Sequence, residues 1–317
     1  MVGWAAIPPE KKMTLRGETI WLDGSFVDWD DAQVHILTHT LHYGLGVFEG
    51  IRCYRTDDGR SAVFRLGEHI KRLYDSAHIN LMEIPFPTEV LEEAVLECLR
   101  RNHLEEGYIR PLVFIGDGEM GLNPGNNPIR VAVIAWPWGS YLGKDGMERG
   151  IRAKVSTFSR HYVNSKMTKG KTCGDYVNSI LAKREALLDG YDEAIMLDTQ
   201  GMVSEASGEN LFAVIDGELH TPPLSMVLDG LTRGCVIELA RDKGIAVHER
   251  ALTRDELYIA DELFLTGTAA EVTPVREVDR RQIGEGRRGP VTGALQAAFF
   301  DVVAGRESKY DRWLTFV

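Results

Sequence analysis

Residues 204–212 read Ser-Glu-Ala-Ser-Gly-Glu-Asn-Leu-Phe, a polar turn that leads into an apolar strand predicted at 210–215. The turn carries two carboxylates, Glu205 and Glu209, of which Glu205 is the candidate ligand. By itself, Glu205 is best interpreted as a turn residue that bonds to its own backbone. Its meaning depends on the other polar clusters of the chain, which are Arg65, a group of three lysines and two turns of small residues.

Both small-residue turns are suited to binding an anion. Gly230-Leu231-Thr232-Arg233-Gly234 opens a predicted helix, and Thr266-Gly267-Thr268-Ala269-Ala270-Glu271 follows a predicted strand. Each turn offers backbone N–H groups and hydroxyls with little side-chain bulk in the way, as a phosphate or carboxylate requires. Two such turns, a lysine and a carboxylate are the components that a phosphate-bearing aldehyde cofactor needs.

The amine for such a cofactor has three candidates, Lys166, Lys169 and Lys171. Lys169 and Lys171 would point to the same side of a strand, so periodicity does not choose between them. Taken as single residues, all three are more typical of solvated charges than of nucleophiles.

The predicted elements indicate an α+β fold with mostly antiparallel sheets and flanking helices. Residues 18–27 predict a hairpin that turns at Asp23-Gly24, and Thr88 is expected to cap a helix. Strands and helices do not alternate regularly, which favours α+β over α/β. Helices are predicted from 66, after 88, at 174–189, 232–243 and 292–303, with a short one from the 253–256 capping box, and strands at 108–115, 130–135, 153–157, 193–197 and 262–265.

A turn-rich segment after Trp138 predicts the domain boundary. We expect a small N-terminal α+β domain at 1–137, an interdomain linker at 138–146 and a large C-terminal α+β domain at 147–317. The large domain carries all three candidate lysines.

Composition excludes several classes of protein. The 317 residues are 44% hydrophobic and carry a formal net charge of −11, which argues against a nucleic-acid partner. No stretch approaches the about 18 apolar residues that span a bilayer, so no membrane partner is expected, and the first twelve residues lack the pattern of a signal peptide. The four cysteines form no CxxC pair. A cytoplasmic enzyme with reduced thiols is expected.

Several segments together resemble a known family. Gly190-Tyr191-Asp192-Glu193-Ala194, followed by residues 204–212, resembles the signature of fold-type IV pyridoxal-phosphate enzymes. Other segments are similar to the branched-chain amino acid aminotransferases within that fold type, and the matches run in family order from about residue 20 to about residue 300. These segments are Leu41-His42-Tyr43-Gly44, Val47-Phe48-Glu49-Gly50-Ile51-Arg52, Tyr108-Ile109-Arg110-Pro111, Gly267-Thr268-Ala269-Ala270-Glu271 and 284–292.

The resemblance implies a cofactor, pyridoxal 5′-phosphate, and a role for each residue near it. Lys171 would form the Schiff base and move the proton during catalysis, and it is the lysine that matches the family's spacing to Tyr176 and Glu205. Glu205 would pair with the pyridinium nitrogen, and Tyr176 would bond the phenolic oxygen of the ring. The phosphate would be held by Arg65, Leu231, Thr232 and Thr268.

The resemblance also implies ping-pong transamination between a branched-chain L-amino acid and 2-oxoglutarate. Tyr108 and the N–H groups of Thr268 and Ala269 would hold the α-carboxylate, and Arg110 would reach the distal carboxylate of glutamate. An apolar pocket would be built by Tyr43, Phe48, Leu122, Trp138 and Tyr141. Because Tyr43 and Leu122 come from the neighbouring subunit in this family, a homodimer or an assembly of dimers is expected. The simpler interpretations are core aromatics for Trp138 and Tyr141, and a surface charge for Arg110.

The chain departs from the family pattern next to the lysine. Asp175 stands where an Asn is usual before the tyrosine, and Thr172-Cys173 are bulkier than the usual pair. An extra carboxylate here is expected to raise the pKa of the lysine or to loosen cofactor binding.

Two alternatives lie within the same fold, a D-amino acid aminotransferase and an aminodeoxychorismate lyase. As families, both lack the Tyr-x-Arg-Pro and Gly-Thr-Ala-Ala-Glu pair found here. An alternative from another class is a zinc hydrolase with His35, His39 and His42 as ligands and Glu49 as general base, which needs the three histidines on one helical face. If residues 34–37 form a strand or loop, these histidines scatter; we expect no metal.

Overall fold

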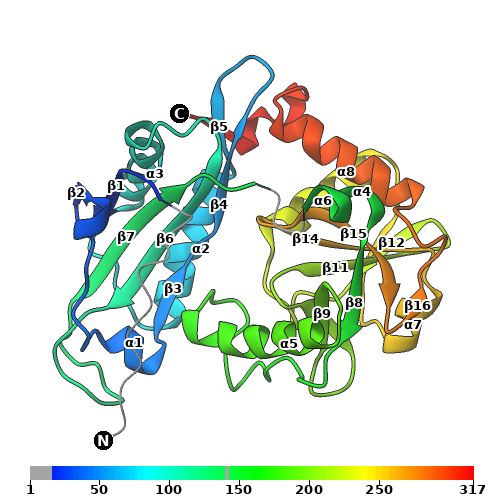
Figure 1. Cartoon of the computed structure of the whole chain (residues 1–317), viewed down its shortest axis with the longest axis horizontal. Helices are drawn as coiled ribbons and strands as arrows, with labels where there is room; N and C mark the ends of the chain where they lie inside the picture. Colours follow the sequence, from blue (N-terminus) through cyan, green and yellow to red (C-terminus); the bar gives the residue numbers. More distant parts are fainter. Residues whose placement is uncertain (1–15, 140–142) are drawn as a thin grey trace, which may run out of the picture.

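The computed structural model describes residues 16–139 and 143–317. Within these residues the chain forms two sheets that lie side by side, one built mainly from the first half of the chain and one from the second (Figure 1). This confirms the α+β class. No helix in the described part of the chain is long and apolar enough to cross a membrane.

The first sheet is antiparallel throughout, with the strand order β17-β5-β4-β6-β7-β1-β2 and β3 paired to β6. The predicted hairpin is confirmed, because Asp23 and Gly24 both have positive φ angles, of 48° and 97°, as a tight two-residue turn requires. Its strands are β1 (Thr19–Leu22), β2 (Ser25–Asp28), β3 (Gly46–Phe48), β4 (Ile51–Arg55), β5 (Ser61–Phe64), β6 (Gly107–Ile115), β7 (Ile129–Trp136) and β17 (Leu314–Phe316).

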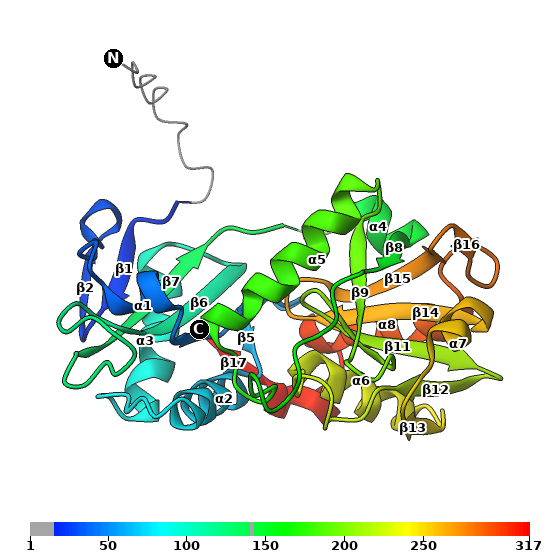
Figure 2. The ribbon, with the colours of Figure 1, turned by 90° about the horizontal axis from the view of Figure 1, so that it is seen from below.

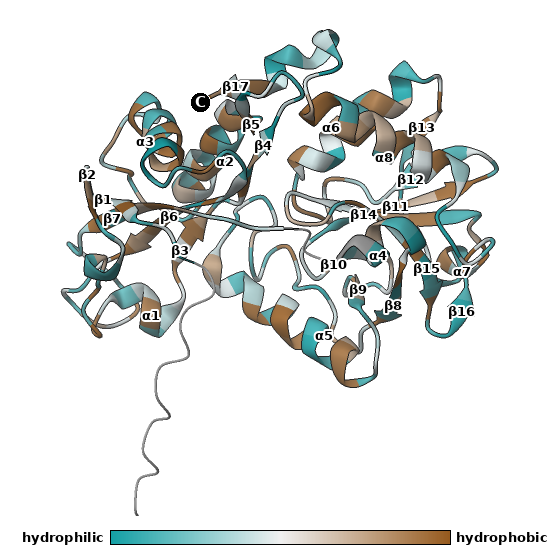
Figure 3. Ribbon diagram, turned by 45° about the horizontal axis from the view of Figure 1, so that its top comes forward, coloured by the Kyte–Doolittle hydropathy of each residue, from teal (hydrophilic) through white to brown (hydrophobic). Residues whose placement is uncertain are grey.

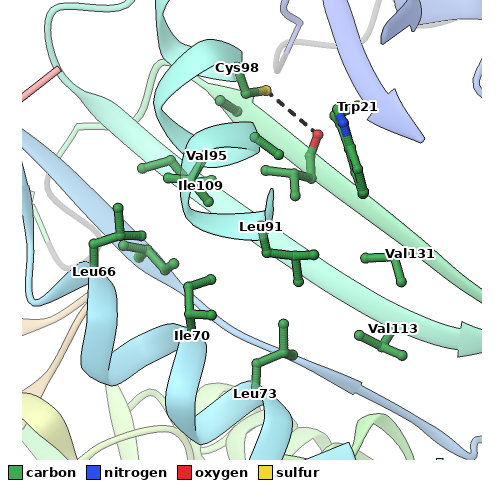
Figure 4. Packing of buried hydrophobic residues seen from close by; sticks show 14 of the residues in the cluster. Trp21, Leu66, Ile70, Leu73, Leu91, Val95, Cys98, Ile109, Val113 and Val131 are labelled. Atoms are coloured by element: carbon green, nitrogen blue, oxygen red, sulfur yellow. Dashed lines mark hydrogen bonds between the residues drawn. The ribbon is translucent and has the colours of Figure 1, made fainter. Parts of the chain in front are cut away.

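Two amphipathic helices, α2 (Leu66–Ile79) and α3 (Thr88–Arg101), cover one face of this sheet. Figure 4 shows their apolar side chains packed against strand residues. The Cys98 thiol donates to the Val133 carbonyl at 3.6 Å. The short helix α1 (His39–Tyr43) lies at the edge of this half. The prediction that Thr88 caps α3 was wrong: Pro87 holds the cap position with extended backbone, and Thr88 is the first helical residue.

The second sheet has the order β10-β9-β8-β15-β14-β11-β12-β13, with β16 paired to β15. It is mixed, because β8 runs parallel to both β9 and β15, and β12 runs parallel to β13. Its strands are β8 (Ile151–Val155), β9 (Glu193–Leu197), β10 (Val203–Ala206), β11 (Asn210–Ile215), β12 (Glu218–Thr221), β13 (Val247–Glu249), β14 (Glu262–Gly267), β15 (Glu271–Val278) and β16 (Arg281–Gln282).

Helices lie around this second sheet (Figure 3). Both α6 and α8 contribute to one apolar core with Phe212 and Phe264 from the strands. The capping box at Thr253 and Glu256 is confirmed. The helices are α4 (Gly143–Arg149), α5 (Tyr176–Leu188), α6 (Leu231–Asp242), α7 (Arg254–Ile259) and α8 (Pro290–Val303), with 3-10 turns at Trp29–Asp31, Cys173–Asp175 and Ser308–Trp313.

The division at 138–146 stays a prediction, and the structure adds two features to it. The C-terminal strand β17 returns to the first sheet, where Leu314 pairs with Phe64 (Figures 1 and 2). Helix α4 begins at Gly143, inside the segment expected to be a linker.

Candidate active site

One cavity of about 470 Å³ lies where the two halves of the chain meet. The first half contributes residues from β3, α2 and β6, and the second half contributes the start of α6 and the turn after β14. The cavity is lined by Phe48, Gly50, Arg72, Tyr108, Arg110, Leu112, Trp138, Lys171, Cys173, Tyr176, Gly208, Glu209, Asn210, Leu228, Gly230, Leu231, Thr232, Thr266, Gly267, Thr268 and Ala269.

Lys171 faces this cavity from the segment that precedes α5. Its amino group donates a hydrogen bond to the Tyr176 hydroxyl and lies 4.9 Å from the centre of the Phe48 ring. The Lys171 main chain is held on both sides, because its N–H donates to Ser76 Oγ at 3.0 Å and its carbonyl accepts from the Phe48 N–H at 3.1 Å. The lysine is therefore fixed at its base while its amino group meets the cavity.

The other two candidate lysines do not line the cavity. Lys166 donates to the Gly174 carbonyl at 3.0 Å. Lys169 donates to the Val227 carbonyl at 3.1 Å and also to the Leu224 carbonyl. Burial lowers the pKa of Lys169, yet its amino group is occupied by these carbonyls. The geometry thus separates three lysines that sequence periodicity could not.

Glu205 lies beside the cavity with both carboxylate oxygens engaged. Arg160 Nη2 is 2.8 Å from Oε1, while Asn210 Nδ2 and the Leu228 N–H donate to Oε2 at 3.3 and 3.2 Å. Because Asn210 and Leu228 line the cavity, the carboxylate is held next to it. Sequence reasoning missed Arg160, which no motif indicates, whereas Asn210 stood within the 204–212 signature.

The start of α6 forms a cup of small residues. A Cβ at Gly230 would lie 1.9 Å from Asn210 Oδ1, so only glycine fits there. Thr232 is buried, and the Leu231 carbonyl accepts a hydrogen bond from Arg65 Nη1 at 2.8 Å. The N–H groups of a helix's first turn have no partner within the helix and can receive an anion.

The turn after β14 lines the same cavity as this cup. Thr266, Gly267, Thr268 and Ala269 all contribute to it, and the Thr266 hydroxyl is buried without a hydrogen-bond partner among the described residues. Amide N–H groups and hydroxyls from these two turns, together with the Lys171 amino group, fit a phosphate-bearing aldehyde. The residues present therefore suit pyridoxal phosphate.

Arg110 stands in an aromatic box on the first sheet. Its guanidinium carbon lies 4.5 Å from the centre of the Phe48 ring, and its Nη2 donates to the Tyr108 hydroxyl at 3.1 Å. Tyr108 in turn packs 4.4 Å from the Trp138 ring, centre to centre. Gly50 makes room for this box, because a Cβ there would meet the Tyr108 hydroxyl at 1.9 Å. Arg110 is thus a partly buried cation facing an apolar cavity rather than a surface charge.

Two of the expected substrate residues, Tyr43 and Leu122, do not line this chain's own cavity. Tyr43 is 44% exposed and Leu122 is 92% exposed, and both lie outside the set that lines it. Tyr141 lies outside the described residues.

Of the departures next to the lysine, Asp175 and Thr172 contact other residues, and Cys173 lines the cavity. The carboxylate of Asp175 lies 3.5 Å from Lys166, not next to the amino group of Lys171. Burial raises the pKa of Asp175, which Lys166 partly offsets. Thr172 accepts from Asn80 Nδ2 at 3.1 Å, and burial raises the pKa of Cys173, which lines the cavity, to about 11.

The zinc alternative does not agree with the geometry. His39 donates to the Gly121 carbonyl and His42 to the Ile36 carbonyl, both at 2.8 Å, while His35 Nδ1 accepts from a main-chain N–H. No group of three metal-binding side chains gathers within residues 16–139 and 143–317. Glu49, the supposed general base, is fully buried and bonded to His69 and Arg72.

Comparison with known proteins gives one consistent result. The family described as amino-transferase class IV matches residues 46–278. The branched-chain-amino-acid aminotransferase of Pseudomonas aeruginosa is 51% identical over 96% of this chain and 99% of its own length, and the Escherichia coli K12 enzyme of the same name is 48% identical over 95% and 97%.

Solved structures agree with the sequence relatives. A crystal structure of the Escherichia coli branched-chain amino acid aminotransferase superposes with a TM-score of 0.92 at 48% identity, over 94% of this chain and 99% of that one. The T.th. enzyme, in a structure with pyridoxamine 5′-phosphate, also gives 0.92 at 48% identity, over 95% and 99%.

The chain therefore belongs to the class IV aminotransferases and, within them, to the branched-chain amino acid aminotransferase family. It is an enzyme that transfers amino groups, in a family that depends on pyridoxal phosphate. The resemblance identified from the sequence motifs, and the fold type that it implied, are confirmed.

Proposed function

We propose that this enzyme transfers the amino group of leucine, isoleucine or valine to 2-oxoglutarate through pyridoxal phosphate held on Lys171. The observation that carries the proposal is a single cavity that combines an apolar aromatic wall with the guanidinium of Arg110. Solved structures of the T.th. relative include one complexed with 4-methylvaleric acid and one with N-(5′-phosphopyridoxyl)-L-glutamate. An aliphatic and an acidic ligand thus bind to a relative of the same fold.

When bound, the cofactor supplies an aldehyde for the substrate amine and a ring that withdraws electrons from the substrate Cα. Lys171 Nζ would hold the cofactor's aldehyde and would carry a proton to and from the substrate. Tyr176, bonded to that amino group, orients it. Glu205 would pair with the ring nitrogen, and its contacts with Arg160 and Asn210 fix the position of its carboxylate.

The phosphate is assigned to the cup at the start of α6. Arg65 bonds the Leu231 carbonyl there, and Thr232 and Thr268 line the cavity beside it. A helix start concentrates N–H groups and a favourable dipole on an anion, so this cup suits a dianion.

The substrate carboxylates are assigned to two places. Tyr108 and the N–H groups of Thr268 and Ala269 receive the α-carboxylate, which all substrates share. Arg110 receives the distal carboxylate of glutamate, because a planar guanidinium pairs with a carboxylate through two hydrogen bonds. Phe48 and Trp138 form the apolar wall for a branched side chain.

We propose that the working enzyme is a homodimer or an assembly of dimers. Apolar residues of and before α1 lie open on the surface, with Ile36 74% exposed and Leu41 60% exposed, and Figure 3 shows this helix in part hydrophobic at the edge of the molecule. Tyr43 and Leu122 are exposed in their own chain, which suits a role in a neighbouring subunit's cavity. The cytoplasmic location stays a prediction, and the proposed activity suits a part in branched-chain amino acid biosynthesis.

A substrate panel tests the proposal directly. The purified enzyme loaded with pyridoxal phosphate is mixed with single amino acids, and the change in the cofactor's visible spectrum is followed. L-leucine, L-isoleucine, L-valine and L-glutamate should each convert it, and D-leucine should not. Conversion by D-amino acids instead, or release of pyruvate from aminodeoxychorismate, would establish one of the two alternatives of the same fold.

A further inference from the structure

Two arginines, one just before helix α2 and one within it, bond to the same segment of the second half. Arg65 directly precedes the helix, with left-handed backbone, and Arg72 lies seven residues later within it. Arg65 Nη1 donates to the Leu231 carbonyl at 2.8 Å, and Arg72 Nη1 donates to the Asp229 carbonyl at 2.6 Å. The carbonyls of Asp229 and Leu231, two positions apart in the segment that opens α6, are therefore bonded by arginines just before and within α2.

Bonding these carbonyls fixes the direction of the N–H groups that follow them. In a trans peptide the carbonyl and the next N–H point in opposite directions, and the described residues contain no cis peptide. The N–H groups of Gly230 and Thr232 therefore point away from the arginines that hold the preceding carbonyls. Both residues line the cavity.

The guanidinium of Arg72 is bonded to the buried carboxylate of Glu49. Its Nε and Nη2 donate to the two oxygens of Glu49 at 2.7 and 2.8 Å, and His69 Nδ1 donates to Glu49 at 2.7 Å. Glu49 is fully buried, while the Arg72 side chain is 13% exposed and lines the cavity. Burial by itself would raise the pKa of Glu49, but Arg72 and His69 outweigh it and keep that pKa well below its ordinary value.

The same cluster is continuous with the cofactor lysine. Glu49 directly follows Phe48, whose N–H donates to the Lys171 carbonyl and whose ring lies 4.9 Å from that of Tyr176, centre to centre. Ser76, one turn after Arg72 on α2, accepts from the Lys171 N–H. Helix α2 and the Phe48-Glu49 segment thus together contact both the main chain of Lys171 and the segment that opens α6.

We propose that Arg72, fixed by Glu49, is a positioning residue for the cofactor phosphate, because it sets the turn whose N–H groups receive that phosphate. The inference rests on the proposed binding of pyridoxal phosphate at this cup. A guanidinium is required, since its planar fork bonds a carboxylate on one side and a carbonyl on the other. A lysine keeps the charge but cannot make both contacts in this geometry.

The test compares two ligands that differ only in the phosphate. Apo-enzyme is titrated with pyridoxal 5′-phosphate and with pyridoxal, and both dissociation constants are measured from the absorbance of the bound aldehyde. Arg72→Lys should weaken pyridoxal phosphate by about tenfold, which corresponds to about 1.4 kcal/mol, and pyridoxal by less than about threefold. Lys71→Met, at the neighbouring exposed position of α2, should change neither constant.

A second variant keeps the test decisive if the first fails to fold. Glu49→Gln leaves Arg72 in place but removes the charge that holds it, so it should produce the same phosphate-selective loss. Equal losses for both ligands, or no loss in either variant, would overturn the inference. Failure of the wild-type enzyme to bind pyridoxal phosphate would instead overturn the proposed function on which the inference rests.

Discussion

The amino group of Lys171 donates a hydrogen bond to the hydroxyl of Tyr176, five positions further along the chain. This contact joins the segment before α5 to the first turn of that helix, and both residues line the cavity. Lys166 and Lys169 are bonded to carbonyls elsewhere. The chemistry assigned to the cofactor amine therefore has one candidate among these three lysines with access to the cavity.

Lys171→Ala should abolish the visible absorption band of the enzyme-bound cofactor. Borohydride reduction of the wild-type enzyme should attach the cofactor irreversibly to Lys171, because of the three candidate amines only this one meets the cavity. Peptide mass spectrometry after reduction locates the label. A label on Lys166 or Lys169 would show that the assignment is wrong.

Glu205→Gln should lower turnover by roughly tenfold to a hundredfold. In the proposed role of Glu205, the substitution would remove a charge-assisted contact to the ring nitrogen, which is worth about 1.5–3 kcal/mol when buried. One decade of rate corresponds to about 1.4 kcal/mol. The substitution also leaves Arg160 without its ion-pair partner. Arg160→Met is therefore the control that separates loss of the carboxylate's charge from loss of its support. Wild-type kcat in the Gln variant would place the carboxylate's role elsewhere.

Local features of the fold were predictable from the sequence, and pairings between distant segments were not. The Asp23-Gly24 hairpin and the capping box at Thr253 depend on a few adjacent residues, whose types fix the turn. Strand β17 pairs with β5, which lies in a distant part of the chain, and no short-range pattern indicates such a partner. The strand β3, with 3 residues that are all buried, is too short to show an alternation.

The candidate site shows the same contrast. The motifs indicated Lys171, Glu205 and Arg110 because each has a fixed spacing within a conspicuous segment. Arg160 and Arg72 act through tertiary contacts, with Glu205 in one case and with Glu49 and the Asp229 carbonyl in the other. Their positions in the sequence, among many other arginines, carry no such information.

Mixing two inactive variants should restore activity if neighbouring subunits complete each other's sites. Lys171→Ala lacks its own cofactor amine, and Leu122→Asp would damage only the partner's pocket, since Leu122 is 92% exposed in its own chain. After the variants are mixed and reassembled, about half of the dimers are hybrids with one intact site each, so activity should approach about a quarter of wild type.

Each variant alone serves as the control for this mixing experiment, together with sedimentation to verify that both remain dimeric. No recovery from verified hybrid dimers would show that Leu122 does not serve a neighbouring site.

Glu209 should make the stability of the apo-protein depend on pH. Burial, with Glu193 and Glu205 nearby and Lys183 opposing them, raises the pKa of this cavity-lining carboxyl to about 8 from an ordinary value of 4.5. Between these two pKa values the folded protein keeps the Glu209 proton, whereas the unfolded chain has lost it. The contribution of protonated Glu209 to the free energy of unfolding is therefore fully present below pH 4.5 and is lost as the pH rises to about 8.

Glu209→Gln, which is neutral at every pH, should flatten this dependence. Urea unfolding of apo wild type and variant between about pH 5 and pH 8 measures the difference, whose slope is at most about 1.4 kcal/mol per pH unit for one proton. Parallel curves for the two proteins would mean that Glu209 titrates as an ordinary carboxyl.

Arg110→Met should separate the acidic substrates from the aliphatic ones. The Arg110 guanidinium carbon lies 4.5 Å from the centre of the Phe48 ring, and its Nε is buried without a hydrogen-bond partner among the described residues, so this group has bonding capacity left for a ligand. Glutamate and 2-oxoglutarate bring a second carboxylate that an apolar wall cannot pair. Leucine and its keto acid do not.

Removing the guanidinium should therefore lower kcat/KM for glutamate and 2-oxoglutarate more than for leucine. The difference in lost transition-state stabilisation should be about 2–5 kcal/mol, because an uncompensated buried carboxylate is costly. Single half-reactions, followed by the cofactor's spectrum with each amino acid alone, measure this directly. Arg110 also donates to the Tyr108 hydroxyl, so Tyr108→Phe is the matched control, and it should slow glutamate and leucine alike through the shared α-carboxylate. If Arg110→Met also slows both substrates equally, Arg110 acts through Tyr108 or the fold and does not select the acidic substrate.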